Sequence, residues 1–130
     1  SMKEKVIIEF SFNNISLSML WASISSPDRL SEWFAESVTL GENNKEFVFR
    51  WGDTTQTAVV IAIRSGCYIR FKWKDEEKEN NSYFEMKLSV DELTGEVTLI
   101  VTDFSEPGEK EDTIQLWEKQ VEDLRRKVGL

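Results

Sequence analysis

The feature that most constrains this fold is a succession of segments in which apolar and polar residues alternate. These segments occupy residues 36–40, 46–51, 57–64, 67–74, 83–90 and 97–104, and residues 6–12 precede them with the same pattern. Such alternation is typical of β-strands, and the mostly short polar turns between the segments favour antiparallel neighbours. The sequence therefore predicts an antiparallel meander of about seven strands.

Two of these strands allow a more detailed prediction. If residues 67–74 and 83–90 form one hairpin, the predicted pairs are Trp73 with Phe84, Phe71 with Met86, Ile69 with Leu88 and Lys72 with Glu85. The apolar run within residues 57–64 is nearly continuous. A run of this kind predicts a strand whose two faces are both covered over part of its length.

Helical spacing appears between the first two strand segments. Leu17, Leu20, Trp21 and Ile24 follow one helical stripe, and Leu30, Trp33 and Phe34 follow a second. Ser26 is predicted to cap the second helix with its side chain and Pro27 to open it, so Ser26→Ala should cost ~0.5–2 kcal/mol. Neither helix is long enough to be stable alone, so both must pack on the sheet.

The C-terminal helix is the longest element that the sequence predicts. Its apolar stripe consists of Ile114, Trp117, Val121, Leu124 and Val128. Acidic residues gather at its start and basic residues at its end, as the helix dipole favours, and Gly129 is placed to stop it. The stripe is too short to sustain a coiled coil, so it indicates a helix packed on the sheet.

The composition excludes several classes of function. A net charge of -8 argues against nucleic acid and anionic membranes as partners, and the longest apolar run, residues 58–63, is too short to span a bilayer. The chain has no histidine, which removes Ser-His-Asp and Cys-His catalysis and histidine-ligated zinc.

Compartment and domain organisation follow from the same composition. The single cysteine, Cys67, excludes an internal disulfide and fits a reducing compartment. Because Met2 is followed by a charged segment and not by the apolar region of a signal peptide, we expect a cytoplasmic protein. We expect residues 2–130 to form a single domain.

The stretch "LWASISSPDRLSEWF" carries a resemblance to a known family. The order of one strand, two short helices, about six strands and a long helix resembles the α+β helix-grip fold of the START-like superfamily. Within it, one branch is similar to the activator of the heat-shock-protein ATPase. That branch has a recurring pattern of two tryptophans with hydrophobic, Thr/Ser and Pro positions between them. In this chain the matching residues are Trp21, Ile24, Ser25, Pro27, Leu30 and Trp33. The branch often has a Gly-Gly turn where this chain has "GENNKEF", so the chain resembles bacterial START-like members more than dedicated co-chaperones.

The resemblance implies a cavity between the sheet and the terminal helix, of the kind that takes apolar molecules in related proteins. The candidate lining residues are Trp21, Trp33, Phe34, Phe49, Trp51, Arg64, Phe71, Trp73, Phe84, Met86, Trp117 and Val121. So many large side chains could equally form a filled core. Alternation places Arg50 and Arg70 on the solvent face, whereas Arg64 could reach the cavity and hold a ligand carboxylate, because its strand lacks a clear polar face.

Three functions remain open at this point. We expect the chain to bind a small apolar ligand without catalysis; the alternative is a domain that assists or contacts another protein, and the lack of histidine disfavours a cyclase or aromatase. We expect no cofactor and no metal. The loop with Glu76, Glu77 and Glu79 lacks the spacing of a calcium loop, as does "DELTGE", where Gly95 serves a turn. Cys67 has no histidine to activate it. The sequence does not determine the oligomeric state.

Overall fold

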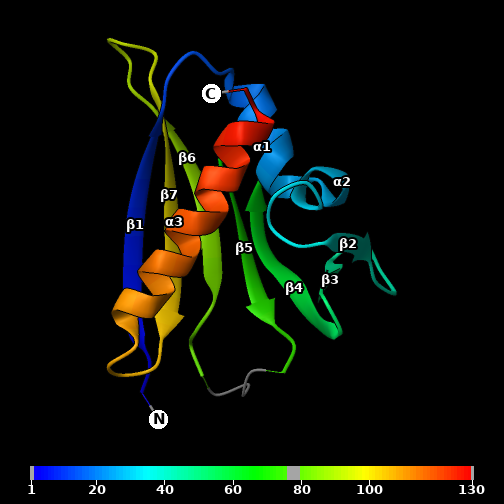
Figure 1. The fold of residues 1–130 in the computed structure, drawn as a ribbon. Helices are drawn as coiled ribbons and strands as arrows, with labels where there is room; N and C mark the ends of the chain where they lie inside the picture. Colours follow the sequence, from blue (N-terminus) through cyan, green and yellow to red (C-terminus); the bar gives the residue numbers. More distant parts are fainter. Residues whose placement is uncertain (1, 76–79, 130) are drawn as a thin grey trace.

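The chain forms one antiparallel sheet with all of its helices on one face (Figure 1). The computed structural model describes residues 2–75 and 80–129. The elements, in chain order, are β1 (Glu4–Phe12), α1 (Leu17–Ser25), α2 (Pro27–Leu30), β2 (Ser37–Leu40), β3 (Glu46–Trp51), β4 (Thr54–Arg64), β5 (Tyr68–Trp73), β6 (Phe84–Val90), β7 (Val97–Ser105) and α3 (Lys110–Lys127). The predicted helix-grip arrangement is confirmed.

The sheet is a meander with one long return. Its strand order is β1-β7-β6-β5-β4-β3-β2, so each strand from β2 to β6 pairs with the next and β1 pairs with β7. In Figure 1, α3 crosses the face of the sheet from the end of β7 towards α1, and α1 and α2 lie beside its far end. This arrangement leaves two sets of inward-facing side chains under α3, one near each end.

The break between α1 and α2 differs from its prediction in one respect. Ser26 takes the N-cap position of α2 with an extended backbone, but its side chain makes no capping hydrogen bond. The predicted side-chain cap is therefore wrong, and α2 is a single turn, with Trp33 and Phe34 in the turn that follows. The hydroxyl that does cap belongs to Ser16, which accepts a hydrogen bond from Met19 N at 3.2 Å at the start of α1.

Trp33 connects the turn after α2 to α1. It is buried, and its Nε1 donates to the carbonyl of Ser23 in α1 at 2.8 Å. The indole thus fixes the turn after α2 against α1, which neither short helix could do by itself.

The predicted register between β5 and β6 is wrong by two residues. Phe84 lies opposite Phe71 and not Trp73, and Met86 lies opposite Ile69. Glu85 therefore pairs with Arg70, whose guanidinium approaches it at 2.8 Å, and not with Lys72. A shift of two residues keeps every side chain on its predicted face, so the core assignment survives the error.

The apolar run in β4 is not covered on both faces. Ile61 is 50% exposed and Ile63 is 55% exposed. The pairing of β4 with β5 shifts between Val60 and Ala62, which marks a bulge in this part of the strand. The prediction of two covered faces is wrong for this part of β4: Ile61 falls at the bulge, and Ile63 is exposed although it lies opposite the buried Ile69.

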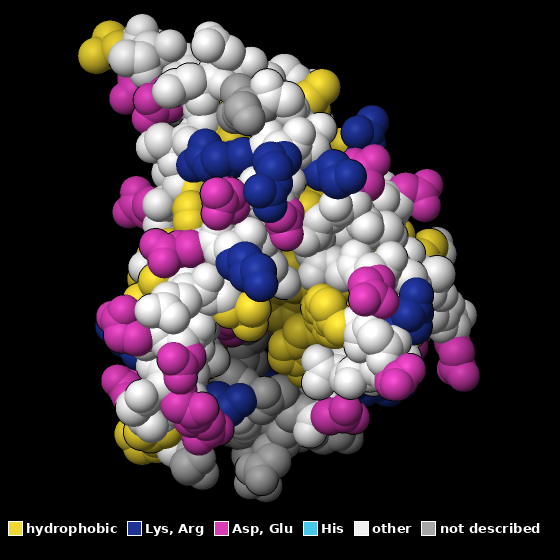
Figure 2. Space-filling view, viewed as in Figure 1, with side chains coloured by type: hydrophobic (Ala, Val, Ile, Leu, Met, Phe, Trp, Pro, Cys, Tyr) yellow, Lys and Arg dark blue, Asp and Glu magenta, His cyan; other side chains and the backbone are white. Residues whose placement is uncertain are grey.

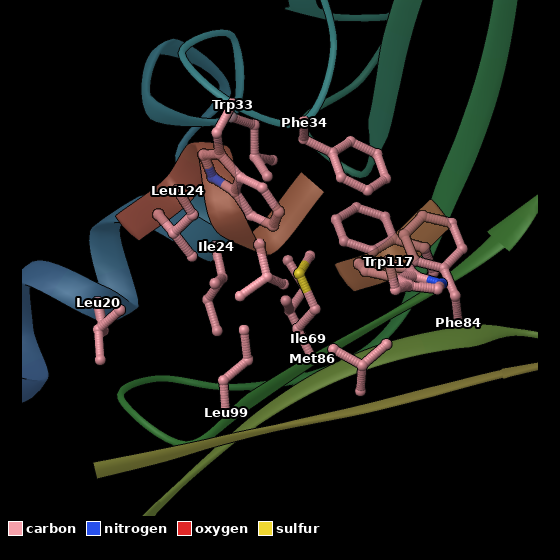
Figure 3. Close-up of a cluster of buried hydrophobic side chains, with 14 of the residues drawn as sticks. Leu20, Ile24, Trp33, Phe34, Ile69, Phe84, Met86, Leu99, Trp117 and Leu124 are labelled. Atoms are coloured by element: carbon pink, nitrogen blue, oxygen red, sulfur yellow. The ribbon is translucent and has the colours of Figure 1, made fainter. Parts of the chain in front are cut away.

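The buried core has two ends of different chemistry (Figure 3). We call the first the aliphatic end; it consists of Leu20, Ile24, Ile69, Leu99 and Leu124, each at most 1% exposed. We call the second the aromatic end; it consists of Phe34, Trp51, Trp73, Phe84 and Trp117. The aliphatic end lies under the C-terminal half of α3 and the aromatic end under its N-terminal half.

Candidate functional site

A cleft of about 400 Å³ opens at the aromatic end. It is lined by Phe34, Trp51, Gln56, Trp73, Phe84, Asp103, Leu116, Trp117 and Gln120. These residues come from α3, from five strands and from the turn after α2. Figure 2 shows hydrophobic side chains gathered in a hollow on this face of the molecule.

The floor of the cleft is a closed circuit of ring contacts. The centroid distances are 5.8 Å for Phe34–Trp51, 6.1 Å for Trp51–Trp73, 5.0 Å for Trp73–Phe84, 6.3 Å for Phe84–Trp117 and 5.6 Å for Phe34–Trp117. Phe34 and Phe84 also stack across the circuit at 5.9 Å. The rings therefore fill the space between themselves, and the cleft lies over them. Trp51 and Trp73 are half-buried, whereas the other three are buried.

Hydrogen bonds hold two of the tryptophans in place. Trp51 Nε1 donates to the carbonyl of Phe34 at 2.9 Å, and Trp117 Nε1 donates to Asp103 Oδ2 at 2.7 Å. The same Phe34 carbonyl accepts a bond from Gln120 Nε2 of α3 at 3.1 Å. Because these indole N–H groups are satisfied within the protein, the rings keep one orientation. The surface over the floor is therefore formed in advance of any ligand.

Few polar groups interrupt this apolar surface. Among the lining residues, Asp103 is the one ionisable side chain, and Gln56 and Gln120 supply amides. Asp103 Oδ1 also accepts a hydrogen bond from Phe104 N at 2.7 Å. Both carboxylate oxygens thus take hydrogen bonds from the protein itself. Such a surface suits stacking on a flat molecule, with hydrogen bonding at the edge.

Eleven of the twelve predicted lining residues lie in the cleft or in the core; the twelfth is Arg64. Phe34, Trp51, Trp73, Phe84 and Trp117 line the cleft. Trp33, Phe49, Phe71, Met86 and Val121 are buried in the core, and Trp21 packs half-buried against that core from α1. The interior is therefore filled at the aliphatic end and open on one side at the aromatic end.

The arginines lie away from the cleft. Arg64 is exposed at the last position of β4, whereas Gln56, which lines the cleft, lies near the first. Along an extended strand these two residues are separated by roughly 25 Å. Arg50 is exposed and pairs with Glu36 at 3.1 Å, and Arg70 bonds Glu85 on the outer surface, as predicted. The structure does not bring Arg64 to the cleft that it describes.

Four lining residues were not predicted: Gln56, Asp103, Leu116 and Gln120. Val97, Leu99 and Val101 face the core, and alternation along β7 places Asp103 on the same face. A carboxylate on the inner face of a strand could therefore have been recognised from the sequence. Gln120 lies one helical turn after Trp117 on the same face of α3, which is the equivalent signal for a helix.

The acidic segments are not part of the cleft that the structure describes. Glu76, Glu77 and Glu79 lie outside the described residues. In the β6–β7 turn, the amides of Thr94 and Leu93 donate to Asp91 and hold its pKa below the ordinary value for an aspartate. Gly95 has a φ of 75°, a conformation that glycine adopts without strain, so this segment has a structural role as a turn. Among the described residues, no helix is long and apolar enough to cross a membrane.

Comparisons with known proteins agree with the predicted family. A solution NMR structure from Bacteroides fragilis is 43% identical, with a TM-score of 0.69, over 100% of this chain and 94% of that one. The Aha1 dimer from Colwellia psychrerythraea is 11% identical, with a TM-score of 0.72, over 96% and 93%. CalU16 from Micromonospora echinospora is 14% identical, with a TM-score of 0.74, over 98% and 77%. The last two show the shared fold alone.

A search among curated proteins gave no match. The family model of the START-like superfamily domain matches residues 1–130. With this match over the whole length, the chain belongs to the START-like superfamily.

Proposed function

We propose that this START-like domain binds a small, flat, apolar molecule in the cleft of the aromatic end and performs no reaction on it. The observation that carries the proposal is the pair of half-buried indoles, Trp51 and Trp73, resting on buried rings. Large apolar surfaces left accessible in a concave site are the usual contact area for small ligands.

The fixed hydrogen bonds of Trp51 and Trp117 add to this support. A guest that stacks on rings held in one orientation loses little free energy to ordering of the protein. The lack of histidine in the sequence and the engagement of both Asp103 oxygens favour binding over general acid–base catalysis. The single Cys67 is consistent with a cytoplasmic location, which we propose as well.

The first test measures binding of Nile red, a neutral and flat dye, by its fluorescence. The wild-type protein should bind the dye, and Trp73→Ala should weaken binding several-fold, because it removes one accessible stacking face. Trp21→Ala is the matched control, since Trp21 is also half-buried but does not line the cleft. Equal losses for the two variants, or no binding by a folded wild type, would refute the proposal.

Native mass spectrometry of the freshly purified protein provides a second test. A small molecule that copurifies with wild type and is lost from Trp73→Ala would support the proposed site.

A protein-contact role is the second candidate, and the exposed Ile61 and Ile63 on β4 favour it. Each is at least half exposed, on a strand whose ladder with β5 is interrupted by a bulge. Exposed apolar residues can form part of a contact surface. A protein without a bound small mass and without Nile red binding, together with a partner whose capture depends on Ile61 and Ile63, would favour this role.

A further inference from the structure

β1 leaves a long edge of the sheet unpaired. Within the part of the chain that the structure describes, the strand order ends at β1 and at β2, and β1 pairs with β7 alone. β1 has nine residues, whereas β2 at the opposite edge has four. In Figure 1, β1 runs along one side of the molecule. The N–H and C=O groups of every second residue of β1 point away from β7, where a further strand can pair with them.

The protection of this edge consists of charged side chains. Native proteins blunt sheet edges with proline, with bulges or with charges. β1 contains no proline, and its register with β7 runs without a shift from Glu4 to Phe12. Charged side chains deter most partners, but they admit a partner whose charges are complementary. The charge pattern of β1 therefore decides what can pair with it.

Three exposed side chains alternate along the outer face of β1: Lys5, Ile7 and Glu9. Ile7 is 58% exposed. Lys5 and Glu9 make no ion pair with any residue that the structure describes. Their cross-strand neighbours on β7 are Phe104 and Ile100, which carry no charge. The single chain thus leaves one cation and one anion unused on either side of an exposed isoleucine.

Pairing two copies of β1 brings these charges together. In an antiparallel pair about a two-fold axis, the residue on the axis faces itself, and the residue two before it faces the residue two after it. An axis at Ile7 sets Lys5 of each copy opposite Glu9 of the other and joins the two exposed isoleucines. An axis at Ile8 would pair all nine residues, but it would set each charged side chain opposite an uncharged one. Opposite charges that face each other stabilise a pair of strands, so the side chains favour the axis at Ile7.

We infer that the β1 edge binds a second copy of this chain, with the axis at Ile7 and with two pairs between Lys5 and Glu9. The ladder spans residues 4–10 of both copies and joins two seven-stranded sheets into one. The net charge of -8 on each copy opposes association, so the dimer is weak and reversible. The inference uses no residue of the aromatic cleft and stands apart from the proposed function.

Sedimentation velocity over a range of protein concentrations tests the inference. The salt concentration is ~0.15 M, where repulsion between the two acidic molecules is screened beyond ~8 Å. Wild type should pass from monomer to dimer as its concentration rises. Lys5→Glu and Glu9→Lys should each weaken self-association about tenfold, because two attractive pairs become repulsive. An equimolar mixture of the two variants should form a heterodimer about as well as wild type forms its dimer, since each glutamate then faces a lysine.

Lys87→Glu is the matched control. Lys87 is also exposed on the outer face of the sheet, but it lies on β6, which β7 separates from β1. This substitution changes the net charge by the same amount as Lys5→Glu, and it should weaken self-association far less. Thermal unfolding of each variant checks that the domain is folded.

Three outcomes would overturn the inference. A folded wild type that stays monomeric up to ~1 mM has no such interface. A dimer that Lys5→Glu and Glu9→Lys leave intact uses another surface, and one that Lys87→Glu weakens equally responds only to net charge. Single variants that lose the dimer without recovering it in the mixture would show that Lys5 does not face Glu9.

Discussion

The two ends of the core lie under the same helix and on the same sheet, yet they pack in different ways. At the aliphatic end, branched side chains from α1, the sheet and α3 are almost completely withdrawn from solvent. At the aromatic end, flat rings contact one another but leave Trp51 and Trp73 half-buried. Branched side chains interdigitate to fill the space between elements, whereas rings held by hydrogen bonds keep their orientation and leave a surface beside them.

The difference teaches that one end can maintain the fold while the other keeps an accessible apolar surface, where we propose that a ligand binds. Burial of apolar surface is the main source of stability, and at the aliphatic end it is complete. At the aromatic end, the buried rings are also held by hydrogen bonds from Trp51 to the carbonyl of Phe34 and from Trp117 to Asp103. These bonds fix the orientation of the two indoles. Substitutions at the two ends should therefore separate stability from binding.

The largest effect is expected at the aromatic end, where α3 packs on the sheet. Trp117 is 4% exposed, yet it also lines the cleft. Trp117→Ala should lower the free energy of unfolding by ~3–5 kcal/mol, because it loses a large buried side chain and leaves a void. Denaturant unfolding measures this loss, and Trp117→Phe controls for the indole N–H that bonds Asp103. A loss below ~1 kcal/mol for the alanine variant would mean that α3 does not grip the sheet at this point.

A somewhat smaller loss of stability is expected at the aliphatic end, with no effect on binding. Leu124 is 1% exposed and lines no cavity that the structure describes. Leu124→Ala should cost ~2–5 kcal/mol and leave the Nile red affinity of the folded protein unchanged. Trp73→Ala should show the opposite pattern, a smaller loss of stability with weaker binding. If both variants changed both quantities equally, the division into two ends would have no functional meaning.

The smallest effect concerns the short helices that cover the aliphatic end. Ser16→Ala removes the side-chain cap of α1 and should cost ~0.5–2 kcal/mol, whereas Ser26→Ala should stay within ~0.5 kcal/mol because its hydroxyl makes no capping bond. Thermal or denaturant unfolding of the two variants gives the comparison directly. A larger loss for Ser26→Ala would show that α2 depends on this hydroxyl after all.

The faces of the strands could be predicted from the sequence, but the pairing of β5 with β6 could not. Alternation assigns Phe71, Phe84 and Met86 to the inner face whichever partner each one has, because a shift by two residues preserves the face. In the observed register, Lys72 donates to the carbonyls of Asn80 and Ser82 instead of pairing with Glu85. A contact of this kind depends on the folded backbone and leaves no periodic signal.

The site was predictable in its aromatic part and not in its polar part. Trp51, Trp73 and Trp117 stand out as large apolar residues in the phase of the core. Whether a given ring lies in a filled core or at a cleft depends on what covers it, which spacing does not reveal. Ile61 and Ile63 show the opposite error, since an apolar run was interpreted as buried although both residues are at least half exposed beside the bulge in β4.

One backbone oxygen sets the width of the cleft. The carbonyl of Phe34 accepts hydrogen bonds from Trp51 on β3 and from Gln120 on α3, so a single atom ties the turn after α2 to both the sheet and the helix. Any outward movement of that turn would break both bonds at once. For the ligand that we propose, a flat molecule could lie on the rings without disturbing these two bonds, whereas a thick, rounded molecule would first have to break them. We therefore expect the cleft to discriminate between ligands by thickness as well as by chemistry.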